Sequence, residues 1–549
     1  NFLTATLAEP SAACAASRRP LMERHGFGAA AAIDTAVQGW TADGSGRFDR
    51  VEVRCFGPER GRGLALAGHM AAAGEVLIRD RPLVAMQHLF SRRLSPCCAG
   101  CLRMVGNLEA HLRRALSNGT RPLEAFPAVA RHPLLKYPRL QLYPARETKA
   151  QEPVPCPVEG CCEVFCSCAC RDRELASGPH RILCLELRDA PRCQKWAQFR
   201  AHARAHHENF LLAARAYAWA ICQVAHGGLG VQHAMLELLA LKSAPWHLLP
   251  RMPQGVGGRP AAVSASPSAR LATLCDSLDL LREALLPAYS QSSLGLAALF
   301  DRDFYSRLLG QFDLVNVSIE YSHPLDATLS LALRDPDDDL HAFAELLEAS
   351  GALREARAVA GCHGPAASPS CREEEDAKGT LPPFLGVGLA RAVALMNHSC
   401  APNCEVDYDG DAVAIVSTLR TVAPGEELTI SYIDEDLPFR RRRELLQRGY
   451  LFTCACPRCN VTQSRVLRSR RGLCIFRPRK VGCRRRMLAA DVAPGKRAEA
   501  VQQANLWEAS ERSSLSSKSA RKHCLNTPAL NTDRACRSKS IGALSCPFD

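Results

Sequence analysis

The stretch Asn397-His398-Ser399-Cys400, which continues as Ala-Pro-Asn to residue 403, decides the fold. A second segment, YLFTCACPRC at 450–459, contains three closely spaced cysteines, Cys454, Cys456 and Cys459. Three thiolates cannot complete the tetrahedral site that zinc adopts in structural centres, so a fourth ligand must come from elsewhere. Cys400 is the natural donor, and the chain is therefore predicted to bring 397–403 and 450–459 together around one metal ion.

Taken singly, these residues have ordinary structural explanations. Asn397 fits a turn, His398 fits a core histidine, and Tyr432 ends an alternating strand, where aromatic side chains are common for packing alone. The incomplete cysteine segment weakens these separate structural explanations, because Cys400, its natural fourth ligand, lies only three residues after Asn397. The combination therefore favours a functional site over isolated packing residues.

A longer cysteine-rich zone lies nearer the start of the chain. It contains four pairs at metal-ligand spacing: Cys98 and Cys101, Cys156 and Cys161, Cys166 and Cys170, and His180 and Cys184. Eight such donors are enough for two closed zinc sites. Free buried cysteine is the alternative, and Cys97 and Cys162 lie beside two of the chosen ligands.

Composition narrows the class of protein. The chain has 549 residues, of which 47% are apolar and 23% charged, as in ordinary globular proteins. Its 27 cysteines, many at short spacings, favour metal binding in a reducing compartment over disulfides. The longest apolar stretch, 209–225, contains Arg215 and is predicted to be a core helix, not a membrane span.

The net charge of +13 belongs to one segment. Residues 461–549 hold 19 of the 69 basic and 6 of the 56 acidic residues, so the rest of the chain is balanced. A serine-rich, aromatic-poor basic tail of this kind is predicted to be disordered. Contact with an anionic partner, including nucleic acid, stays open as an alternative.

The pattern of apolar residues predicts a mixed fold. Strands are predicted at 50–56 and 61–67, as a pair within 74–84, and at 427–432. Residues 404–408 and 412–419 flank Asp409-Gly410, a strong hairpin signal. Helices are predicted over 195–356, with a Gly/Pro/Ser break at 255–268, and at 440–448.

Four segments in this order resemble known motifs. Arg60-Gly61-Arg62-Gly63-Leu64, NHSCAPN at 397–403, GEELTISYID at 425–434 and YLFTCACPRC at 450–459 resemble SET and post-SET motifs. The order of the earlier cysteine pairs resembles a MYND finger. A MYND finger between the first two motifs resembles the SET- and MYND-domain (SMYD) lysine methyltransferases, over roughly 47–190 and 381–460. In its long insertion within the finger, the chain resembles the fifth vertebrate SMYD protein and its plant trithorax-related counterpart.

The resemblance implies an α+β architecture, in which a SET-domain β fold is split by a treble-clef-like MYND zinc finger and a helical insert. The expected parts are, in order, an N-terminal extension at 1–46, predicted to be disordered, SET residues 47–96, the finger at 97–184, the insert and linkers at 185–380, SET residues 381–435, a zinc-bound post-SET segment at 436–460 and the disordered basic tail at 461–549.

The resemblance also implies roles for single residues. Three zinc ions are expected, held by Cys98, Cys101, Cys166 and Cys170, by Cys156, Cys161, His180 and Cys184, and by Cys400, Cys454, Cys456 and Cys459. S-adenosylmethionine is the expected cofactor, contacted by Arg60, Arg62, Asn316, Asn397, His398 and Phe452. Tyr432 is the expected catalytic tyrosine, and Tyr450 is expected to wall the lysine channel.

Three functions follow from these features. The leading hypothesis is an S-adenosylmethionine-dependent protein-lysine N-methyltransferase acting on a histone or another basic protein, in nucleus and cytoplasm. The alternative is an interaction scaffold, whose finger binds proline-containing peptides while the SET fold is inactive. A third hypothesis makes the basic tail a nucleic-acid binder, with affinity that falls steeply with salt. None of the three involves a membrane.

Overall fold

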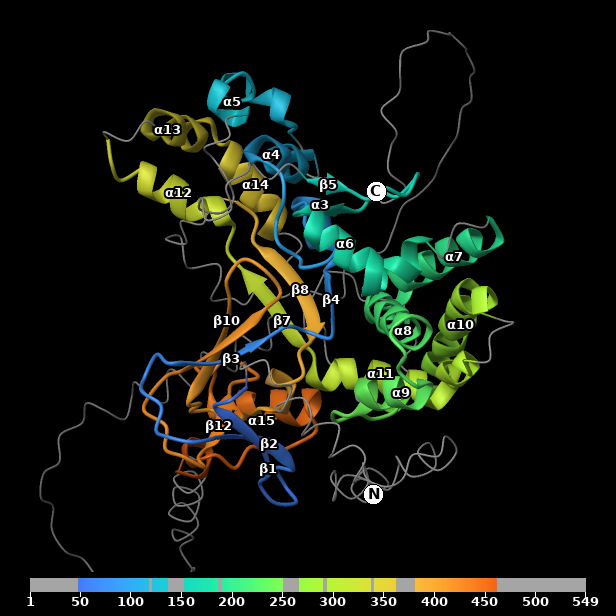
Figure 1. Ribbon diagram of the computed structural model, residues 1–549. Coiled ribbons are helices and arrows are strands. Elements are labelled where there is room, and N and C mark those ends of the chain that lie inside the picture. Colours follow the sequence, from blue (N-terminus) through green and yellow to red (C-terminus); the bar gives the residue numbers. More distant parts are fainter. Residues whose placement is uncertain are drawn as a thin grey trace, which may run out of the picture. The chain divides into compact units, whose positions relative to one another are not determined.

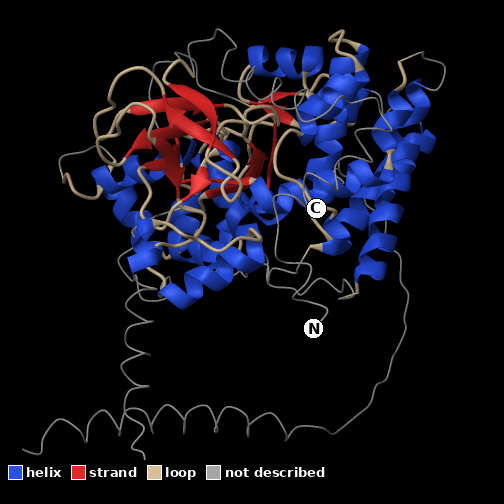
Figure 2. Ribbon diagram, turned by 90° about the horizontal axis from the view of Figure 1, so that it is seen from below, coloured by secondary structure: helices blue, strands red, loops and turns tan. Residues whose placement is uncertain are grey.

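The computed structural model describes residues 48–117, 121–136, 153–185, 190–249, 266–289, 294–336, 340–361 and 381–461 (Figure 1). All of the described residues belong to one unit of the chain, which lies within 1–465. The predicted N-terminal extension and, apart from Val461, the predicted basic tail lie outside the described residues. The described part mixes helices with small sheets, as predicted, and Figure 2 shows the strands gathered together beside the helices.

The first sheet places Asn397 and His398 beside the strand that leads to Tyr432. Its strand order is β1-β2-β12-β9, with β1 Val51–Cys55, β2 Arg62–Leu66, β12 Glu427–Ile430 and β9 Asn397–His398. β9 runs parallel to β12, with Asn397 opposite Thr429 and His398 opposite Ile430. Because β12 also pairs with β2, three distant parts of the chain meet in this sheet.

Three further sheets complete the β structure. Their strand orders are β10-β11-β3, β4-β8-β7 and β5-β6. The strands are β10 Cys404–Tyr408, β11 Ala414–Thr418, β3 Val76–Asp80, β4 Val84–Gln87, β8 Phe384–Leu389, β7 Val317–Tyr321, β5 Val154–Pro155 and β6 Val164–Phe165. The predicted hairpin is confirmed by the antiparallel pairing of β10 with β11, and Gly410 in its turn has a left-handed φ of 71°.

Two predictions about strands are wrong. Residues 74–84 do not form a strand pair, because β3 pairs with β11 and β4 pairs with β8. Pro82 lies between the two strands, and β4 is buried along its whole length and packs against α8. The predicted helical insert also contains β7, which pairs with β8 along its whole length.

One group of helices shares its apolar core with the first sheet. These helices are α7 Ala190–His206, α8 Asn209–Ala225, α9 Val231–Leu239, α10 Pro267–Leu285 and α11 Arg302–Val315. The predicted core helix is α8, in which Phe210 and Tyr217 are fully buried. The Tyr217 hydroxyl donates to the Leu299 carbonyl at 2.6 Å. Within the described ranges, no helix is long and apolar enough to cross a membrane.

A second apolar core includes the long insertion in the cysteine-rich zone. It joins α4 Leu108–Ser117 and α5 Pro127–Ala130 to α12 Pro324–Ala332, α13 His341–Ser350 and α14 Ala352–Gly361. His111 and His323 are buried there, and their Nδ1 and Nε2 atoms lie 3.0 Å apart. His111 also bonds the Val105 carbonyl at 3.0 Å, so this pair ties the insertion to the start of α12.

The remaining elements are short. They are α3 Leu89–Leu94, α6 Cys168–Ser177, α15 Phe439–Gly449, the 3-10 segments Leu123–Ala125, Pro133–Lys136, Trp246–Leu248, Leu286–Tyr289, Leu296–Phe300 and Val393–Leu395 (η8), and the π segment Arg181–Leu185. The predicted helix at 440–448 is confirmed as α15, which leads into the final cysteines.

The substitution Gly310→Ala should destabilise the protein, although alanine normally favours a helix over glycine by ~1 kcal/mol. A Cβ at Gly310 would lie 1.9 Å from the carbonyl oxygen of Ala244, so α11 or the Ala244 segment would have to move. We expect urea unfolding to show a loss of about 2 kcal/mol or more.

The control for this prediction is Gly230→Ala, whose Cβ would meet only His233 Nδ1, at 3.5 Å. Because Gly230 is the N-cap of α9, where alanine is less favourable than glycine, that variant should lose no more than about 1 kcal/mol. A Gly310→Ala protein as stable as the control would contradict the tight packing of α11 on the Ala244 segment.

Candidate functional site

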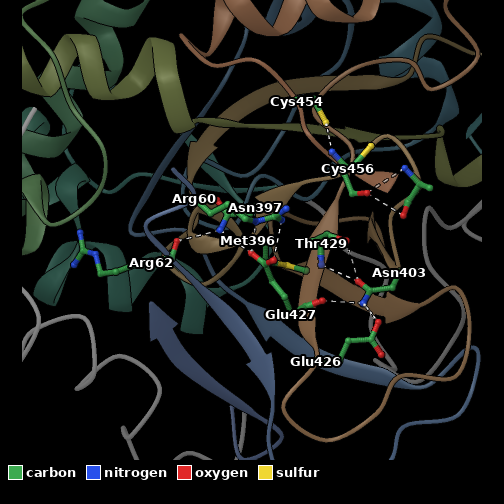
Figure 3. A network of polar contacts seen from close by, with 12 residues as sticks. Arg60, Arg62, Met396, Asn397, Asn403, Glu426, Glu427, Thr429, Cys454 and Cys456 are labelled. Atoms are coloured by element: carbon green, nitrogen blue, oxygen red, sulfur yellow. Dashed lines mark hydrogen bonds and ion pairs between the residues drawn. The ribbon is translucent and has the colours of Figure 1, made fainter. Parts of the chain in front are cut away.

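The candidate site is centred on the side chain of Asn397, at the edge of the first sheet. Its Nδ2 donates to Glu427 Oε1 at 2.8 Å and to the Arg62 carbonyl at 3.3 Å. A Cβ on Gly63 would lie 2.8 Å from this Nδ2, so the amide approaches β2 where only glycine leaves space. Figure 3 shows Asn397 and Glu427 pointing toward one another.

Glu427 joins Asn397 to Arg60. Arg60 Nη2 lies 2.8 Å from Glu427 Oε2, and Arg60 Nε donates to Oε1 at 3.2 Å. Glu427 was not among the predicted site residues, although it lies within the GEELTISYID segment. The available signal was a carboxylate on a predicted strand. Its place beside the arginines and Asn397 could be recognised only once β12 was known to pair with β2.

Arg62 contributes its backbone to this cluster and directs its side chain elsewhere. Its Nη2 donates to the Ala240 carbonyl at 2.6 Å, just after α9. In Figure 3 the guanidinium extends away from Asn397. The two arginines predicted together therefore have different contacts, with Arg60 paired to Glu427 and Arg62 reaching the helical region.

The His398 ring is buried and occupied by contacts within the protein. Its Nδ1 accepts from the Tyr432 backbone N–H at 3.0 Å, so the proton lies on Nε2, which faces Cys400 Sγ at 3.2 Å. Burial, together with the charges of Arg60 and Arg442, lowers the pKa of His398 to about 4. The neutral ring thus links the strand carrying Tyr432 to the cysteine cluster.

The rings of Tyr432 and Phe452 lie against this histidine, and Tyr450 packs on Tyr432. Tyr432 and Tyr450 have ring centroids 4.8 Å apart, and the Phe452 ring lies 6.4 Å from that of Tyr432 and 5.9 Å from His398. The Tyr432 hydroxyl donates to the Met396 carbonyl at 2.5 Å, and the Tyr450 hydroxyl donates to the Tyr432 carbonyl at 3.0 Å. Burial raises the pKa of both tyrosines, so both phenols keep their protons at neutral pH.

Asn316 is a buried amide without a hydrogen-bond partner among the described residues, for either its nitrogen or its oxygen. It ends α11, and the next residue, Val317, pairs with Gly388 on the strand that leads toward Asn397. Unpaired buried polar groups are costly and uncommon in folded proteins. Such an amide is well suited to contact a polar ligand.

Asp80 anchors the segment that leads into Asn397. Its Oδ2 accepts from the backbone N–H groups of Ala392 and Val393 at 2.7 and 3.0 Å, at the start of η8. Burial raises the pKa of Asp80 from 3.8 to about 6, partly opposed by these hydrogen bonds. The carboxyl group therefore fixes the main chain just before the site, although its negative charge is poorly solvated.

The structure brings the predicted metal ligands together in three groups of four. These are Cys98, Cys101, Cys166 and Cys170; Cys156, Cys161, His180 and Cys184; and Cys400, Cys454, Cys456 and Cys459. Within each group the ligand atoms all lie within 4.8 Å of one another. Neither Cys97 nor Cys162 joins a group, and Cys97 Sγ instead faces the Ser95 carbonyl at 3.7 Å.

The third group is fully buried and adjoins the aromatic residues. Cys400 Sγ lies 3.5 Å from Cys459 Sγ and 3.9 Å from Cys454 Sγ. The side chain of Arg442, on α15, is buried beside Cys400 and Cys459, and its Nη1 donates to the Leu437 carbonyl at 2.6 Å. A cation beside several thiolates offsets their mutual repulsion.

Comparisons with known proteins agree with this arrangement. A family model described as "SET domain" matches residues 298–433, a range that contains Asn316, Asn397 and Tyr432. The histone-lysine N-methyltransferase ATXR2 of Arabidopsis thaliana is 25% identical over 444 residues, which are 70% of this chain and 85% of that protein.

Shorter matches concern other relatives. The histone-lysine N-methyltransferase SMYD3 of Homo sapiens is 41% identical over 75 residues, and the N-lysine methyltransferase SMYD2 of Gallus gallus is 43% identical over 79 residues. Each match covers 14% of this chain and less than a fifth of the relative, 17% and 18%.

Asp80 gives a pH-dependent prediction. Because its folded pKa exceeds the unfolded value, the folded state binds this proton more tightly, and the contribution is present at low pH and lost as pH rises through about 6. From pH 8 to pH 5, the wild type should gain about 1.4 kcal/mol in unfolding free energy relative to Asp80→Asn.

This difference is measured by urea unfolding at both pH values. The matched control is Asp276→Asn, on the exposed side of α10, which should follow the wild type at both pH values. A stability difference between wild type and Asp80→Asn that is independent of pH would contradict the assignment.

Proposed function

We propose that the chain is a SET-domain protein-lysine methyltransferase of the SMYD type, which methylates lysine in a histone or another basic protein at the site around Asn397, Tyr432 and Phe452. The observation that carries this assignment is the parallel pairing of β9 with β12. This pairing joins the Asn397–Glu427–Arg60 network to the three aromatic residues. The names of two relatives support a histone substrate.

The residues around Asn397 fit S-adenosylmethionine. Arg60, Asn316, Asn397 and Phe452 would hold it, with the His398 backbone, and the unpaired Asn316 amide would gain a partner. Arg62 would contribute through its backbone, since its guanidinium is directed to Ala240. When bound, this cofactor would supply a methyl group on a sulfonium, which is a good leaving group. A neutral amine nitrogen would form the new bond to the methyl carbon while the carbon–sulfur bond breaks. The electron pair of that bond would stay on sulfur, which leaves as a neutral thioether, and the surplus proton of the amine would leave to solvent.

Tyr432 would orient the reactants without exchanging a proton. Its hydroxyl hydrogen is directed to the Met396 carbonyl, which leaves the oxygen lone pairs available to the methyl group and the amine. Its raised pKa keeps the phenol neutral. Tyr450, with its ring 4.8 Å away, would form one wall of a lysine channel whose apolar surroundings favour the uncharged amine.

We further propose that each cysteine group binds one zinc ion. In a tetrahedral site with zinc–sulfur distances of about 2.3 Å, neighbouring sulfurs lie about 3.8 Å apart. The measured sulfur separations are 3.5 Å for Cys98 to Cys170 and for Cys101 to Cys166, 3.7 Å for Cys156 to Cys184, and 3.5 and 3.9 Å for Cys400 to Cys459 and Cys454. Thiolate and imidazole donors in this geometry suit zinc.

The same assignment gives the proposed domain layout. SET residues 47–96 and 381–435 are separated by a MYND finger at 97–184 and an insert at 185–380, and 436–460 form the post-SET segment. The insert is not purely helical, since it contains β7. Proline-peptide binding by the finger, nucleic-acid binding by the tail and location in nucleus and cytoplasm stay predictions.

The first test is methyl transfer from labelled cofactor to histones, with purified protein supplied with zinc. Tyr432→Phe should lower kcat about tenfold or more, because it removes the oxygen while keeping the ring. Tyr289→Phe, outside the site, is the control and should retain wild-type activity. Equal labelling by wild type and Tyr432→Phe would remove Tyr432 from this role. A wild-type protein that does not bind the cofactor would instead favour the interaction scaffold.

The second test links zinc to cofactor binding. The wild type should contain three zinc ions, and Cys400→Ser should contain two. The variant should also bind S-adenosylmethionine about tenfold more weakly, because the third cluster holds the turn that carries Tyr450 and Phe452. The exposed Cys55 belongs to none of the clusters, so Cys55→Ser should change neither quantity. Wild-type cofactor affinity with only two zinc ions would contradict this coupling.

A further inference from the structure

The turn that carries Tyr450 and Phe452 contains an unfavourable backbone conformation. Leu451 has a φ of 62°, in the left-handed region, and only one other non-glycine residue in the described part, Leu102, has a positive φ. This position follows the end of α15, where glycine is the usual residue. A side chain there must be stabilised by its surroundings, because its Cβ approaches the following carbonyl.

Lys242, from the segment after α9, contacts this turn. Its Nζ donates to the Tyr450 carbonyl at 2.9 Å and lies 5.9 Å from the centre of the Phe452 ring. The Tyr450 carbonyl belongs to the peptide that joins directly to Leu451. One ammonium group therefore contacts the residues on both sides of the strained position.

The backbone of Lys242 is held in place, although its side chain is exposed. Its neighbours Leu241 and Ser243 are buried, with 2% and 1% of their surfaces exposed. Arg62 Nη2 donates to the Ala240 carbonyl at 2.6 Å, and Ala244 packs closely on Gly310 of α11. The segment is thus fixed both to β2 and to the helical core, and its lysine reaches a third part of the chain.

From these contacts we infer that Lys242 is a positioning residue of the methyltransferase site, which holds the turn at Leu451 in the conformation that directs Phe452 toward the cofactor and Tyr450 toward the lysine channel. This inference rests on the proposed function. The helical region then contributes to cofactor binding through a residue that does not touch the cofactor. Simple capping of the α15 C-terminus by a lysine is the alternative, and it would affect stability alone.

The test compares Lys242→Met with Lys242→Arg in the full chain loaded with zinc. Lys242→Met keeps much of the aliphatic chain but removes the donor and the charge. It should raise the Kd for S-adenosylmethionine about fivefold, a modest effect because the ammonium is exposed. Lysine methylation at saturating cofactor should keep kcat within about twofold of the wild type, since the reacting groups are unchanged. Lys242→Arg should restore most of the affinity.

A second background tests the route through Leu451. Glycine adopts a φ near 62° without steric conflict, so Leu451→Gly removes the strain that Lys242 offsets. Lys242→Met should therefore weaken cofactor binding less in the Leu451→Gly background than in the wild type. The same loss in both backgrounds would overturn the inference. Lys195→Met, at a surface ion pair with Glu283, is the control and should leave the affinity unchanged.

The outcomes separate this inference from the proposed function. A wild type that binds the cofactor, together with Lys242→Met of equal affinity and kcat, would overturn the role of Lys242 and leave the methyltransferase assignment intact. A wild type that does not bind the cofactor would remove both. Reduced thermal stability of Lys242→Met with wild-type cofactor affinity would support capping alone, and would also overturn the inference.

Discussion

The gathering of Cys400 with Cys454, Cys456 and Cys459 is the constraint on which the candidate site depends. Cys400 follows β9 directly, and the other three cysteines follow the turn after α15. A bond network around one ion would therefore fix the distance between the strand carrying Asn397 and the segment carrying Phe452. The His398 ring reinforces this link, because it bonds the Tyr432 N–H on one side and faces Cys400 on the other.

The two helical regions have different relations to this site. The group formed by α7 to α11 shares a core with the first sheet and reaches the site through the segment 240–244. The group formed by α4, α5 and α12 to α14 has its own apolar core, built partly from the insertion in the cysteine-rich zone. That insertion is a folded part of the protein where it is described, joined to α12 by the buried pair of His111 and His323.

Local sequence signals predicted those parts of the structure that depend on local chemistry. The hairpin at Asp409-Gly410, the apolar helix α8 and the spacing of the paired cysteines each required only a few neighbouring residues, and the structure contains all three. The partners of β3 and β4 could not be predicted in this way, because Val76–Asp80 and Val84–Gln87 lie close in sequence but join different sheets.

The site residues that the sequence missed have the same physical explanation. The contacts of Glu427 depend on β12 lying beside β2. The contact of Lys242 with Tyr450 depends on the end of α9 lying beside the end of α15. Arg62 was predicted with Arg60, but Gly61 between them has a left-handed φ of 67°, and the two side chains have different partners. The local sequence pattern does not predict the contacts of long charged side chains, because these side chains reach segments that are distant in the sequence.

The short segment Met396-Asn397 contributes to both parts of the proposed chemistry, the binding of the cofactor and the alignment of the reactants. Met396 accepts the hydrogen of the Tyr432 hydroxyl, and the next residue, Asn397, reaches Glu427 and through it Arg60. The position of the Asn397 amide, proposed to bind the cofactor, and the orientation of the Tyr432 hydroxyl, proposed to align the reactants, are therefore fixed by adjacent peptide units. Asp80 anchors the main chain a few residues earlier. Because the Tyr432 hydroxyl donates to a backbone carbonyl of this segment, any displacement of the segment would alter the direction of the lone pairs on the Tyr432 oxygen as well as the position of Asn397. In the proposed function, cofactor binding and reactant alignment would therefore be coupled through a single segment of main chain.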